Sequence, residues 1–571
     1  MSAALVAAAA LLAYVAGYRF YSGWLARKVF KLDPLAIMPS SAQEDGIDFV
    51  PTRPQVLFGH HYASIAGLAP MLGPAVAVFW GWLPALCWVV FGAIFIGCVH
   101  DFSALVLSTR HQAKSIGSLC AEILGNRAKA LFLALIFFGV SLAMGVFVYV
   151  ISLLFSWGAD FQPEQLAVSI TSFPQVVMPS AGLMLIALLA GWCLYVRKLP
   201  LVAVTTVGFL LLLGLIWLGF KNPTVGFSLE QWPQQQSWIW ILMAYAFAAS
   251  VLPVWLLLQA RDFLNSLLLI AGLVLMYAGF FIQNPSFDAP AINPNPVGAP
   301  PLLPFVFITI ACGAASGFHS LVSSGTTARQ LKCETDARPI GYGAMLAESL
   351  LALIAVLACT TTLGGKTAWA NAYVNWAAVQ GLGAKLGIFI RGAASFIVEL
   401  GIDRDLAVTL VAMVVVSFAL TTLDSATRLL RFNIEEIGAS IGGIATIICN
   451  RFVATGLACA AILFFAFYQI DGKPAGLVLW TLFGGTNQLI AGLALLTGAV
   501  YLKQAGRTHW PLSLPAAYML VNTVLALGIK AWDFYRLEQT LLLVLSLILL
   551  GIAGGVITTL QRSWRLAADK H

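Results

Sequence analysis

The sequence has few charged residues and no long polar linker or low-complexity tail. Only 10% of its 571 residues are Asp, Glu, Lys or Arg, whereas a soluble domain carries about 25%. Hydrophobic residues make up 60%, and the mean hydropathy is +0.90. This composition excludes a soluble protein and predicts an all-α integral membrane protein. The net charge of +7 then indicates basic loops on the cytoplasmic side rather than a nucleic-acid surface.

The sequence also lacks a recognisable metal motif. Its nine cysteines show neither metal-ligand spacing nor a disulfide framework, and His-Glu-x-x-His does not occur. His60 and His61 are adjacent, so one helix face cannot present both rings to the same ion. We therefore expect no metal and no cofactor. An intramembrane metal-dependent enzyme is the less favoured alternative, because no nucleophile or metal stands at a suitable spacing from a base.

Apolar runs long enough to cross a bilayer are abundant. A span needs about 20 apolar residues. By this measure we predict about fifteen spans, at residues 2–19, 60–80, 82–108, 129–156, 178–196, 200–220, 238–259, 263–282, 303–325, 341–362, 405–425, 452–470, 475–500, 513–531 and 539–560.

Lys and Arg gather in every second connection, beginning with residues 20–57, whereas residues 157–177 and 283–302 contain neither. The positive-inside rule then places the N-terminus in the periplasm and the C-terminus in the cytoplasm. Residues 384–400 are a further apolar stretch, which includes Arg391 and Glu399. If this stretch crossed the membrane, the basic connection that follows it would lie on the periplasmic side, against the positive-inside rule. We predict that they form a helix lying on, or re-entering from, the outer face.

The span order suggests an internal repeat. With the first span set aside, spans two to six and seven to eleven form two sets of five that start in opposite directions, as an inverted repeat requires. We predict an N-terminal helix and cytoplasmic segment at 1–57 and a transporter core at 58–425. The core divides into repeats at 58–220 and 238–425. A cytoplasmic segment and four further spans follow at 426–571.

Glycine and proline interrupt the second predicted span. Irregular backbone at membrane depth persists only when it is buried in protein or lines a wet cavity, and transporters bind substrates at such breaks. A second proline interrupts the seventh span, although it can equally be a simple kink in a packed helix. We predict that the breaks bind substrate through Ser64, Ala66, Gly67, Ala69, Pro70 and Pro253.

Placing a charged side chain at the centre of a membrane span costs about 2.5–3.5 kcal/mol of free energy. Ionisable residues within the predicted spans are therefore expected to have a structural or functional role. We predict one cluster on the cytoplasmic side that carries a coupling proton or forms a gate, with a hydrogen-bonded network that fixes helix packing as the alternative. Asp424 and Arg428 are four residues apart and are expected to pair. Glu348 is a further functional candidate whose partner is not evident. The predicted cluster comprises His60, His61, His100, Asp101, His319, Asp424 and Arg428.

Hydroxyl side chains crowd the end of the ninth predicted span. Ser323, Ser324 and Thr327 are candidates for a sodium site, because sodium prefers hard oxygen ligands. The alternative is that these small polar residues let helices pack closely and hydrogen-bond to one another.

Several long segments, in order along the chain, resemble the carbon starvation protein A family of bacterial peptide and pyruvate transporters. That family is similar to the amino acid–polyamine–organocation superfamily. The matching segments are Phe58-Gly-His-His-Tyr-Ala-Ser-Ile-Ala-Gly67, His100-Asp-Phe102, Ser316-Gly-Phe-His319, Ser323-Ser-Gly-Thr-Thr327, Leu420-Thr-Thr-Leu-Asp-Ser-Ala-Thr-Arg428 and Leu482-Phe-Gly-Gly-Thr-Asn-Gln-Leu489.

The resemblance implies a LeuT-like 5+5 inverted-repeat core, with one N-terminal and four C-terminal extra helices. It also implies proton-coupled uptake of peptides or pyruvate across the inner membrane during carbon starvation, by alternating access. A sodium-coupled symporter of small carboxylates or amino acids is the alternative. The family usually has Gly-Ala-Gly-Pro at the first break, whereas this chain has Gly67-Leu-Ala-Pro70, which puts the same substrate in doubt. Free amides at a helix start favour anions, so a substrate carboxylate is the expected ligand.

Overall fold

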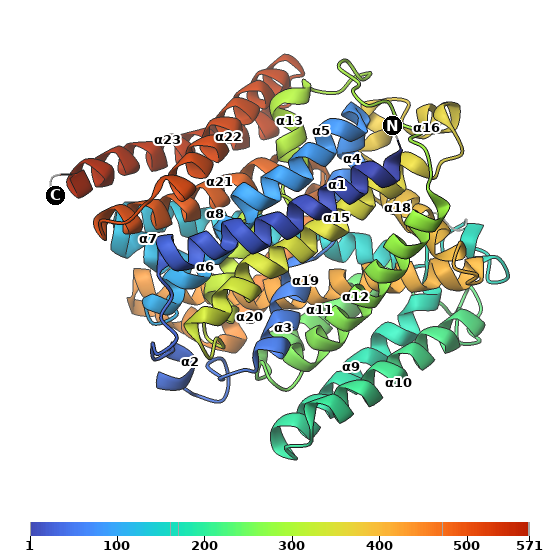
Figure 1. Cartoon of the computed structure of the whole chain (residues 1–571), viewed down its shortest axis with the longest axis horizontal. Helices are drawn as coiled ribbons and strands as arrows, with labels where there is room; N and C mark the ends of the chain where they lie inside the picture. Colours follow the sequence, from blue (N-terminus) through green and yellow to red (C-terminus); the bar gives the residue numbers. More distant parts are fainter. Residues whose placement is uncertain (1, 160, 169–170, 471, 569–571) are drawn as a thin grey trace.

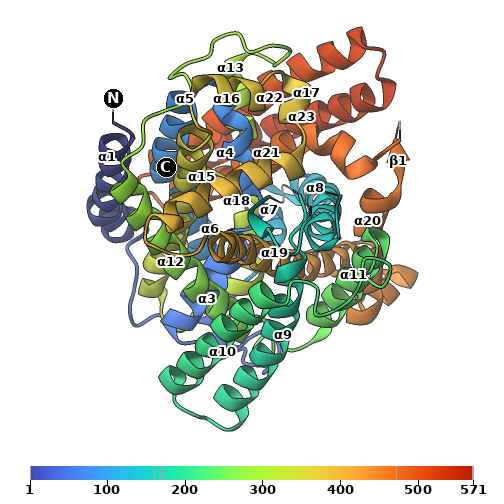
Figure 2. The ribbon, with the colours of Figure 1, turned by 90° about the vertical axis from the view of Figure 1, so that its right-hand side faces the viewer.

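A computed structural model describes residues 2–159, 161–168, 171–470 and 472–568. The described chain is a bundle of helices, and its two ends lie on opposite sides of the bundle (Figure 1). The strands β1 (Gln469–Ile470) and β2 (Lys473–Pro474) form a short antiparallel pair. Viewed from one end, α9 and α10 form an outer pair at the edge of the bundle (Figure 2). The prediction of an all-α membrane protein is confirmed.

The first half of the chain forms α1 (Ala3–Ala16), α2 (Pro39–Ala42), α3 (Pro54–Ile65), α4 (Ala69–Ala77), α5 (Trp82–Cys87), α6 (Cys98–Arg110), α7 (Ile116–Leu124), α8 (Asn126–Phe155), α9 (Val177–Gly191), α10 (Leu201–Lys221), α11 (Gln235–Val251) and α12 (Leu258–Gln283). The second half forms α13 (Leu302–Thr309), α14 (Gly317–Val322), α15 (Ala344–Thr361), α16 (Lys366–Ala372), α17 (Trp376–Val379), α18 (Leu382–Val398), α19 (Arg404–Ile441), α20 (Arg451–Phe467), α21 (Ala475–Gln504), α22 (Trp510–Arg536) and α23 (Thr540–Ala568).

Among the described residues, ten helical segments are long and apolar enough to cross a membrane. The bent pair α3 and α4 makes an eleventh if it is one span. The predicted number of fifteen is not reached by this measure, because several apolar runs are short or broken. Residues 451–467, for example, form an apolar helix of 17 residues, and residues 303–325 are divided between α13 and α14.

The first predicted break is present. Helix α3 ends at Ile65, α4 begins at Ala69, and the two are bent by 45°. The second predicted break is wrong. Pro253 lies in the turn between α11 and α12, so no helix continues across it.

The second interrupted helix is instead the one predicted at 303–325. Here α13 ends at Thr309 and α14 begins at Gly317. Within the interruption Gly313 has a φ of +86°, a left-handed conformation that an L side chain rarely adopts. The sequence analysis placed the second break at a proline. This break was overlooked because glycine, and not proline, marks it.

Two other predicted boundaries differ from those in the structure. Helix α19 is a single helix of 38 residues, so the proposed end of the core at residue 425 lies inside it. Arg428 and Arg431 therefore belong to a buried helix that continues past the predicted end of the core. The first predicted span, at residues 2–19, continues as helix to Phe30.

Residues 384–400 correspond to α18, which packs against α4, α12, α15 and α19. Its Leu386, Phe389 and Ile390 are fully buried. This excludes a helix lying flat on the surface, because a flat helix would leave one face of its apolar residues uncovered by protein. The re-entrant alternative stays a prediction.

Candidate functional site

The two interrupted helices meet. A Cβ atom added to Gly73 of α4 would lie 2.7 Å from the carbonyl oxygen of Thr309, at the end of α13. A Cβ added to Gly313 would lie 3.5 Å from the Cα of Pro70. The absence of these side chains lets the first turns of α4 lie directly against the second break, in the buried core of the chain.

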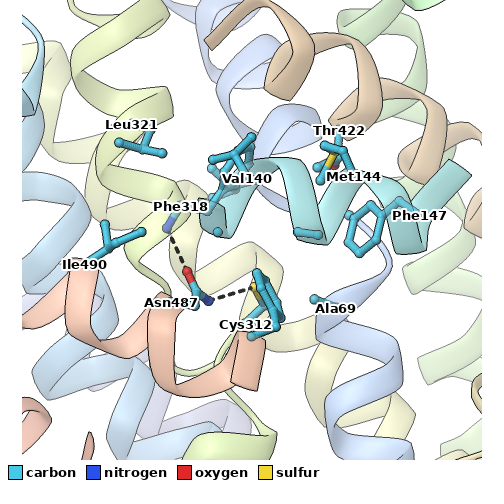
Figure 3. Close-up of a pocket in the computed structure, with 15 residues that line it drawn as sticks. Ala69, Val140, Met144, Phe147, Cys312, Phe318, Leu321, Thr422, Asn487 and Ile490 are labelled. Carbon is cyan, nitrogen blue, oxygen red and sulfur yellow. Dashed lines mark hydrogen bonds between the residues drawn. The ribbon is translucent and has the colours of Figure 1, made fainter. Parts of the chain in front are cut away.

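A cavity lies at this junction (Figure 3). It is lined by residues from both breaks and from α8, α14, α19 and α21, namely Ile65, Gly67, Ala69, Gly139, Val140, Ala143, Met144, Phe147, Cys312, Phe318, Leu321, Thr422, Phe483, Asn487 and Ile490.

Two of the six predicted substrate residues, Gly67 and Ala69, line this cavity. Ala66 and Pro70 belong to the same break but are not lining residues, and Ser64 faces α19. Pro253 was wrongly grouped with them. It lies in the α11–α12 turn, where the next amide, that of Val254, donates to the carbonyl of Ile47.

Asn487 of α21 holds the second break in place. Its Oδ1 accepts a hydrogen bond from the Phe318 amide at 3.0 Å, and its Nδ2 donates to Ser316 Oγ at 3.1 Å. Figure 3 shows the amide contact and a further contact to Cys312. Sequence analysis assigned α21 to the extra C-terminal helices and gave Asn487 no role. The only signal was the Leu482–Leu489 segment that carries part of the family resemblance.

One ionisable network joins α6, α14 and α15 beside this break. His319 shares a hydrogen bond of 2.9 Å with Asp101, which shares another of 2.8 Å with His100. The other ring nitrogen of His319 lies 3.2 Å from Glu348 Oε2. Glu348 Oε1 in turn accepts from the Gly313 amide at 3.0 Å. The four ionisable side chains are fully buried, and the partner of Glu348 that the sequence did not reveal is His319.

A second network joins α3, α11, α12 and α19. His60 Nδ1 lies 2.6 Å from Asp262 Oδ2, and Arg261 donates to Asp262 Oδ1 at 2.8 Å. Arg261 also pairs with Asp424, to which Tyr245 donates its hydroxyl hydrogen. The seven residues of the predicted single cluster are therefore divided, with three in the first network, two in this one, and His61 and Arg428 in neither. Sequence analysis missed Arg261, Asp262 and Tyr245, because nothing local marks them as partners of α3 and α19.

His61 belongs to neither chain of contacts. Its Nδ1 shares a hydrogen bond of 2.8 Å with Thr327 Oγ1. This bond links the first half of the first broken helix, α3, to the helical turn that follows α14.

The predicted pairing of Asp424 with Arg428 is also wrong. Arg428 donates to Asp48 Oδ1 at 2.8 Å and to the Ala249 carbonyl at 2.9 Å. The spacing of four residues permits the pair, but the two side chains find other partners on α12 and on the segment that precedes α3. Arg428 thus ties that N-terminal segment and the end of α11 to α19.

Of the three hydroxyl residues proposed for sodium, Ser324 and Thr327 have protein partners, whereas Ser323 Oγ is buried without one among the described residues, and the sodium site stays a prediction. Ser324 Oγ accepts from the Ile116 amide at 3.0 Å and donates to the Ser320 carbonyl at 2.7 Å, and Thr327 is held by His61. Another set of hydroxyls gathers at the first break. Ser64 Oγ lies 3.0 Å from Ser425 Oγ, and Thr422 donates to the Ser64 carbonyl at 3.3 Å.

Cys312, His319 and Glu348 each place one ligand atom within 4.8 Å of the others, a spacing that a metal ion could bridge. Each side chain has at least one protein contact, although His319 Nε2 and Glu348 Oε2 make no hydrogen bond among the described residues. The Cys312 thiol donates to Ser316 Oγ at 3.2 Å, and His319 has Asp101 and Glu348 at its two ring nitrogens. We interpret the set as a protein network, and the absence of a metal stays a prediction.

Comparison with known proteins identifies the family. The sequence profile described as carbon starvation protein CstA matches residues 2–375 and 366–526. The protein named peptide transporter CstA of Campylobacter jejuni is 33% identical over 578 residues, covering 92% of this chain and 80% of its own. The protein named pyruvate/proton symporter BtsT of Escherichia coli K12 is 32% identical over 622 residues, covering 93% and 82%. Both names are those of transporters, which confirms the predicted transporter over the enzyme.

Solved structures give a weaker likeness. The crystal structure of MhsT in complex with L-phenylalanine aligns over 83% of this chain and 98% of its own, with 13% sequence identity and a TM-score of 0.46. The sequence match, which covers most of the chain, is decisive. This chain belongs to the carbon starvation protein CstA family.

Proposed function

We propose that this protein is a secondary active transporter of the bacterial inner membrane that takes up peptides or pyruvate with protons, by alternating access. The observation that carries the proposal is the cavity enclosed where two interrupted helices meet. Irregular backbone inside a membrane bundle is tolerated where it lines such a site. The names of the relatives from Campylobacter jejuni and Escherichia coli support both substrates.

The substrate carboxylate binds at the start of α4. Ala69 is the first residue of this helix and lines the cavity. Pro70 has no N–H, and the amides of Met71 and Leu72 donate to the Leu68 carbonyl, so Ala69 supplies the remaining amide of this first turn. The helix dipole also favours negative charge there. Peptides and pyruvate share a carboxylate, so this part of the site accepts either.

The coupling proton binds in the network of His100, Asp101, His319 and Glu348. Histidine is the side chain whose charge ordinarily changes near neutral pH. Glu348 holds the amide of Gly313, so a proton gained or lost here changes the charge directly beside the second break. The other polar groups close to His319 and Glu348 are His61 and Tyr62 from α3, Cys98 from α6 and Cys312 from the break itself.

The second network and the Arg428–Asp48 pair form the inner gate. The network joins the first broken helix to α12 and α19, and the Arg428–Asp48 pair joins the segment before that helix to α19. The segment carrying Asp48 is part of the basic stretch 20–57, which the positive-inside rule places in the cytoplasm. In this orientation the N-terminus is periplasmic and the C-terminus cytoplasmic.

The boundaries of the proposed inverted repeat change. Residues 310–316 form the second break in place of Pro253, but they lie in the third predicted span of the second repeat, whereas residues 66–68 lie in the first span of the first repeat. The division into halves at residues 220 and 238 therefore does not place the two breaks at corresponding positions. We extend the core to Ile441, the end of α19, keep four C-terminal spans, and add α21 to the parts that form the substrate cavity, because Phe483, Asn487 and Ile490 line it.

Sodium coupling is the second candidate function. The hydroxyls of Ser64, Thr422 and Ser425 meet at the first break, where a helix end frees carbonyl oxygens. A cation there would have the hard oxygen ligands that sodium prefers.

The test is uptake of a labelled dipeptide and of labelled pyruvate by the purified protein in liposomes. An inward proton gradient is expected to accelerate uptake in sodium-free buffer, and collapse of that gradient with a protonophore should remove the acceleration. Uptake that ignores the proton gradient but follows a sodium gradient would favour the second candidate. Absence of uptake of both solutes would reject the transport proposal.

A further inference from the structure

The first membrane span ends in a basic stretch. The span runs as helix from Ala3 to Phe30, and α1, its first part, lies at the edge of the bundle (Figure 2). Residues 19–32 contain Arg19, Arg27, Lys28 and Lys31 and no acidic residue. A helix rises 1.5 Å per residue, so about 20 residues cross a hydrocarbon layer of about 30 Å. The part of the helix that follows residue 22 therefore lies at the level of the lipid headgroups.

Two guanidinium groups lie side by side at this end of the span. A Cβ atom added to Gly23 would lie 3.5 Å from Arg27 Nη2 and 3.6 Å from Arg338 Nη2. Arg27 Nε donates to the Gly23 carbonyl at 3.1 Å. Arg338 Nε donates to Ser22 Oγ at 2.9 Å, and its Nη2 donates to the Tyr18 carbonyl at 2.9 Å. These bonds hold Arg27 and Arg338, which we call the guanidinium pair, beside the same glycine.

No acidic side chain neutralises the guanidinium pair among the described residues. Glu334, which lies four residues before Arg338, is instead paired with Arg110 at 2.6 Å. Two like charges that lie side by side repel each other unless an anion lies close to both. Arg27 is exposed and Arg338 is partly buried, so an anion can approach the pair from outside the bundle.

Aromatic rings lie beside the guanidinium pair. Arg338 Cζ lies 4.9 Å from the centre of the Tyr18 ring. The Tyr21 ring stacks on that of Trp24 with their centres 5.8 Å apart, and Trp24 lies 5.6 Å from Trp510, the first residue of α22. Tyrosine and tryptophan are enriched where a membrane meets water. The rings therefore indicate, independently of the helix length, that the pair lies at the level of the headgroups.

We propose that the guanidinium pair binds the phosphate of an anionic phospholipid in the cytoplasmic leaflet. Guanidinium groups bind phosphate oxygens through paired N–H donors, and a basic stretch at the end of a span attracts an anionic membrane surface. A free phosphate ion has the same oxygens. The exposed apolar side chains of Val15 and Phe20, on the same helix, favour instead a ligand that also has acyl chains.

The bound headgroup joins two spans. Arg27 belongs to the first span, whereas Arg338 begins the helical stretch that continues into α15. A phosphate shared by the two arginines therefore stabilises the contact between an outer helix and the core. The inference does not rest on the proposed transport function, and its test uses no transported solute.

Thermal unfolding of the full chain in an uncharged detergent, with added phosphatidylglycerol, tests the inference. Phosphatidylglycerol is expected to raise the unfolding temperature until the effect saturates, whereas zwitterionic phosphatidylethanolamine at the same concentrations should not. Equal stabilisation by the two lipids would overturn the inference, because the anionic charge would then have no part in binding. Inorganic phosphate that stabilises the protein with the same half-saturating concentration would also overturn it, since the site would then take a free ion.

Variants of the pair locate the site. A basic residue near an anionic membrane surface strengthens binding roughly fivefold. Arg27→Gln is expected to raise the half-saturating concentration of phosphatidylglycerol by that factor, and the double variant with Arg338→Gln by roughly 30-fold. Arg197→Gln is the matched control, because Arg197 is also exposed at a helix end and lies over an aromatic ring, that of Trp192. An unchanged value for Arg27→Gln, or an equal shift in the control, would overturn the inference.

A carboxylate built into the protein gives the reverse test. Gly23 has helical backbone angles, with φ of −65° and ψ of −36°, that any residue adopts. Gly23→Asp places a carboxylate beside both guanidinium groups and is expected to abolish the stabilisation by phosphatidylglycerol. Gly23→Ala is its control, since the added Cβ meets no atom closer than 3.5 Å. Stabilisation of Gly23→Asp at the half-saturating concentration of the control would overturn the inference by placing the lipid elsewhere.

Discussion

The Nε2 of His319 lies 3.2 Å from the Oε2 of Glu348, and both side chains are fully buried. The first residue belongs to α14, just beyond the second break, and the second to α15. Because Glu348 also accepts the Gly313 amide, this pair connects a titratable group to the conformation of the break.

Replacement of Glu348 by Gln is expected to uncouple uptake from protons. The amide keeps the size and the oxygen that accepts from Gly313, but it cannot hold a negative charge opposite His319. Uptake driven by a proton gradient should fall to the rate seen without one, while exchange of labelled for unlabelled substrate continues. The matched control is His509→Gln, at the start of α22 and far along the chain from the site. Gradient-driven uptake at the wild-type rate in Glu348→Gln would contradict the assignment.

Replacement of Asp48 by Asn is expected to loosen the N-terminal segment, because Arg428 loses its charged partner. A hydrogen bond to a charged group contributes about 1.5–3 kcal/mol, so opening should become roughly tenfold more frequent. Cys333 reports this change, since its thiol donates to the Pro34 carbonyl of the same segment. Its alkylation rate, followed by mass spectrometry, should rise by that factor, whereas the exposed Cys449 should react as before. An unchanged alkylation rate of Cys333 would contradict the proposal that the Arg428–Asp48 pair holds the N-terminal segment in place.

Replacement of Asn487 by Ala is expected to impair substrate binding and to destabilise the protein by about 1–3 kcal/mol. The change removes the acceptor for the Phe318 amide and the donor to Ser316, both at the second break. Gln504→Ala lies at the exposed end of the same helix and serves as the control. The measurement is the concentration for half-maximal uptake together with thermal unfolding in detergent. Identical values for the two variants would show that Asn487 only fills space.

Replacement of Gly317 by Ala is expected to prevent correct packing of α14 against α21. A Cβ there would lie 2.2 Å from the Asn487 carbonyl oxygen and 2.6 Å from the Ala491 amide nitrogen, and backbone atoms cannot turn aside. Gly528→Ala is the opposite case, because a Cβ there would have no atom within 4 Å. Alanine stabilises a helix by about 0.5–1 kcal/mol relative to glycine. Thermal unfolding should show a large loss for the first and a small gain for the second. Equal stability would contradict the close contact.

Removal of metal is expected to have no effect on uptake. The Cys312, His319 and Glu348 side chains are engaged by protein partners, so the proposed mechanism needs no ion between them. Dialysis against a chelator should leave uptake unchanged, and Cys312→Ser should retain it. Loss of uptake that zinc or manganese restores would show that the trio is a metal centre.

Part of this organisation could be predicted from local chemistry. The first break was visible because Gly67, Pro70, Gly73 and Pro74 each weaken a helix within one short segment. Gly67 and Ala69 were placed correctly at the cavity for the same reason. The second break was missed, since its glycines resemble those that simply allow close packing in a membrane helix.

The pairing of charges could not be predicted. Arg428 stands four residues from Asp424 but binds Asp48, 380 residues away in sequence, and Asp424 binds Arg261. Local spacing determines which side chains share a helix face, whereas the packing of helices determines which side chain they meet.

The sequence by itself determined that this is a helical membrane protein, which family it belongs to, and where one helix is broken. Hydropathy and backbone preference act within short stretches of chain, so they can be read without the fold. Only the tertiary structure decided that α21 completes the cavity at the two breaks and that most of the buried histidines and acids divide into two networks. The physical reason is that a buried polar group must be satisfied by whatever partner the folded chain brings within about 3 Å, and that partner is set by packing across hundreds of residues.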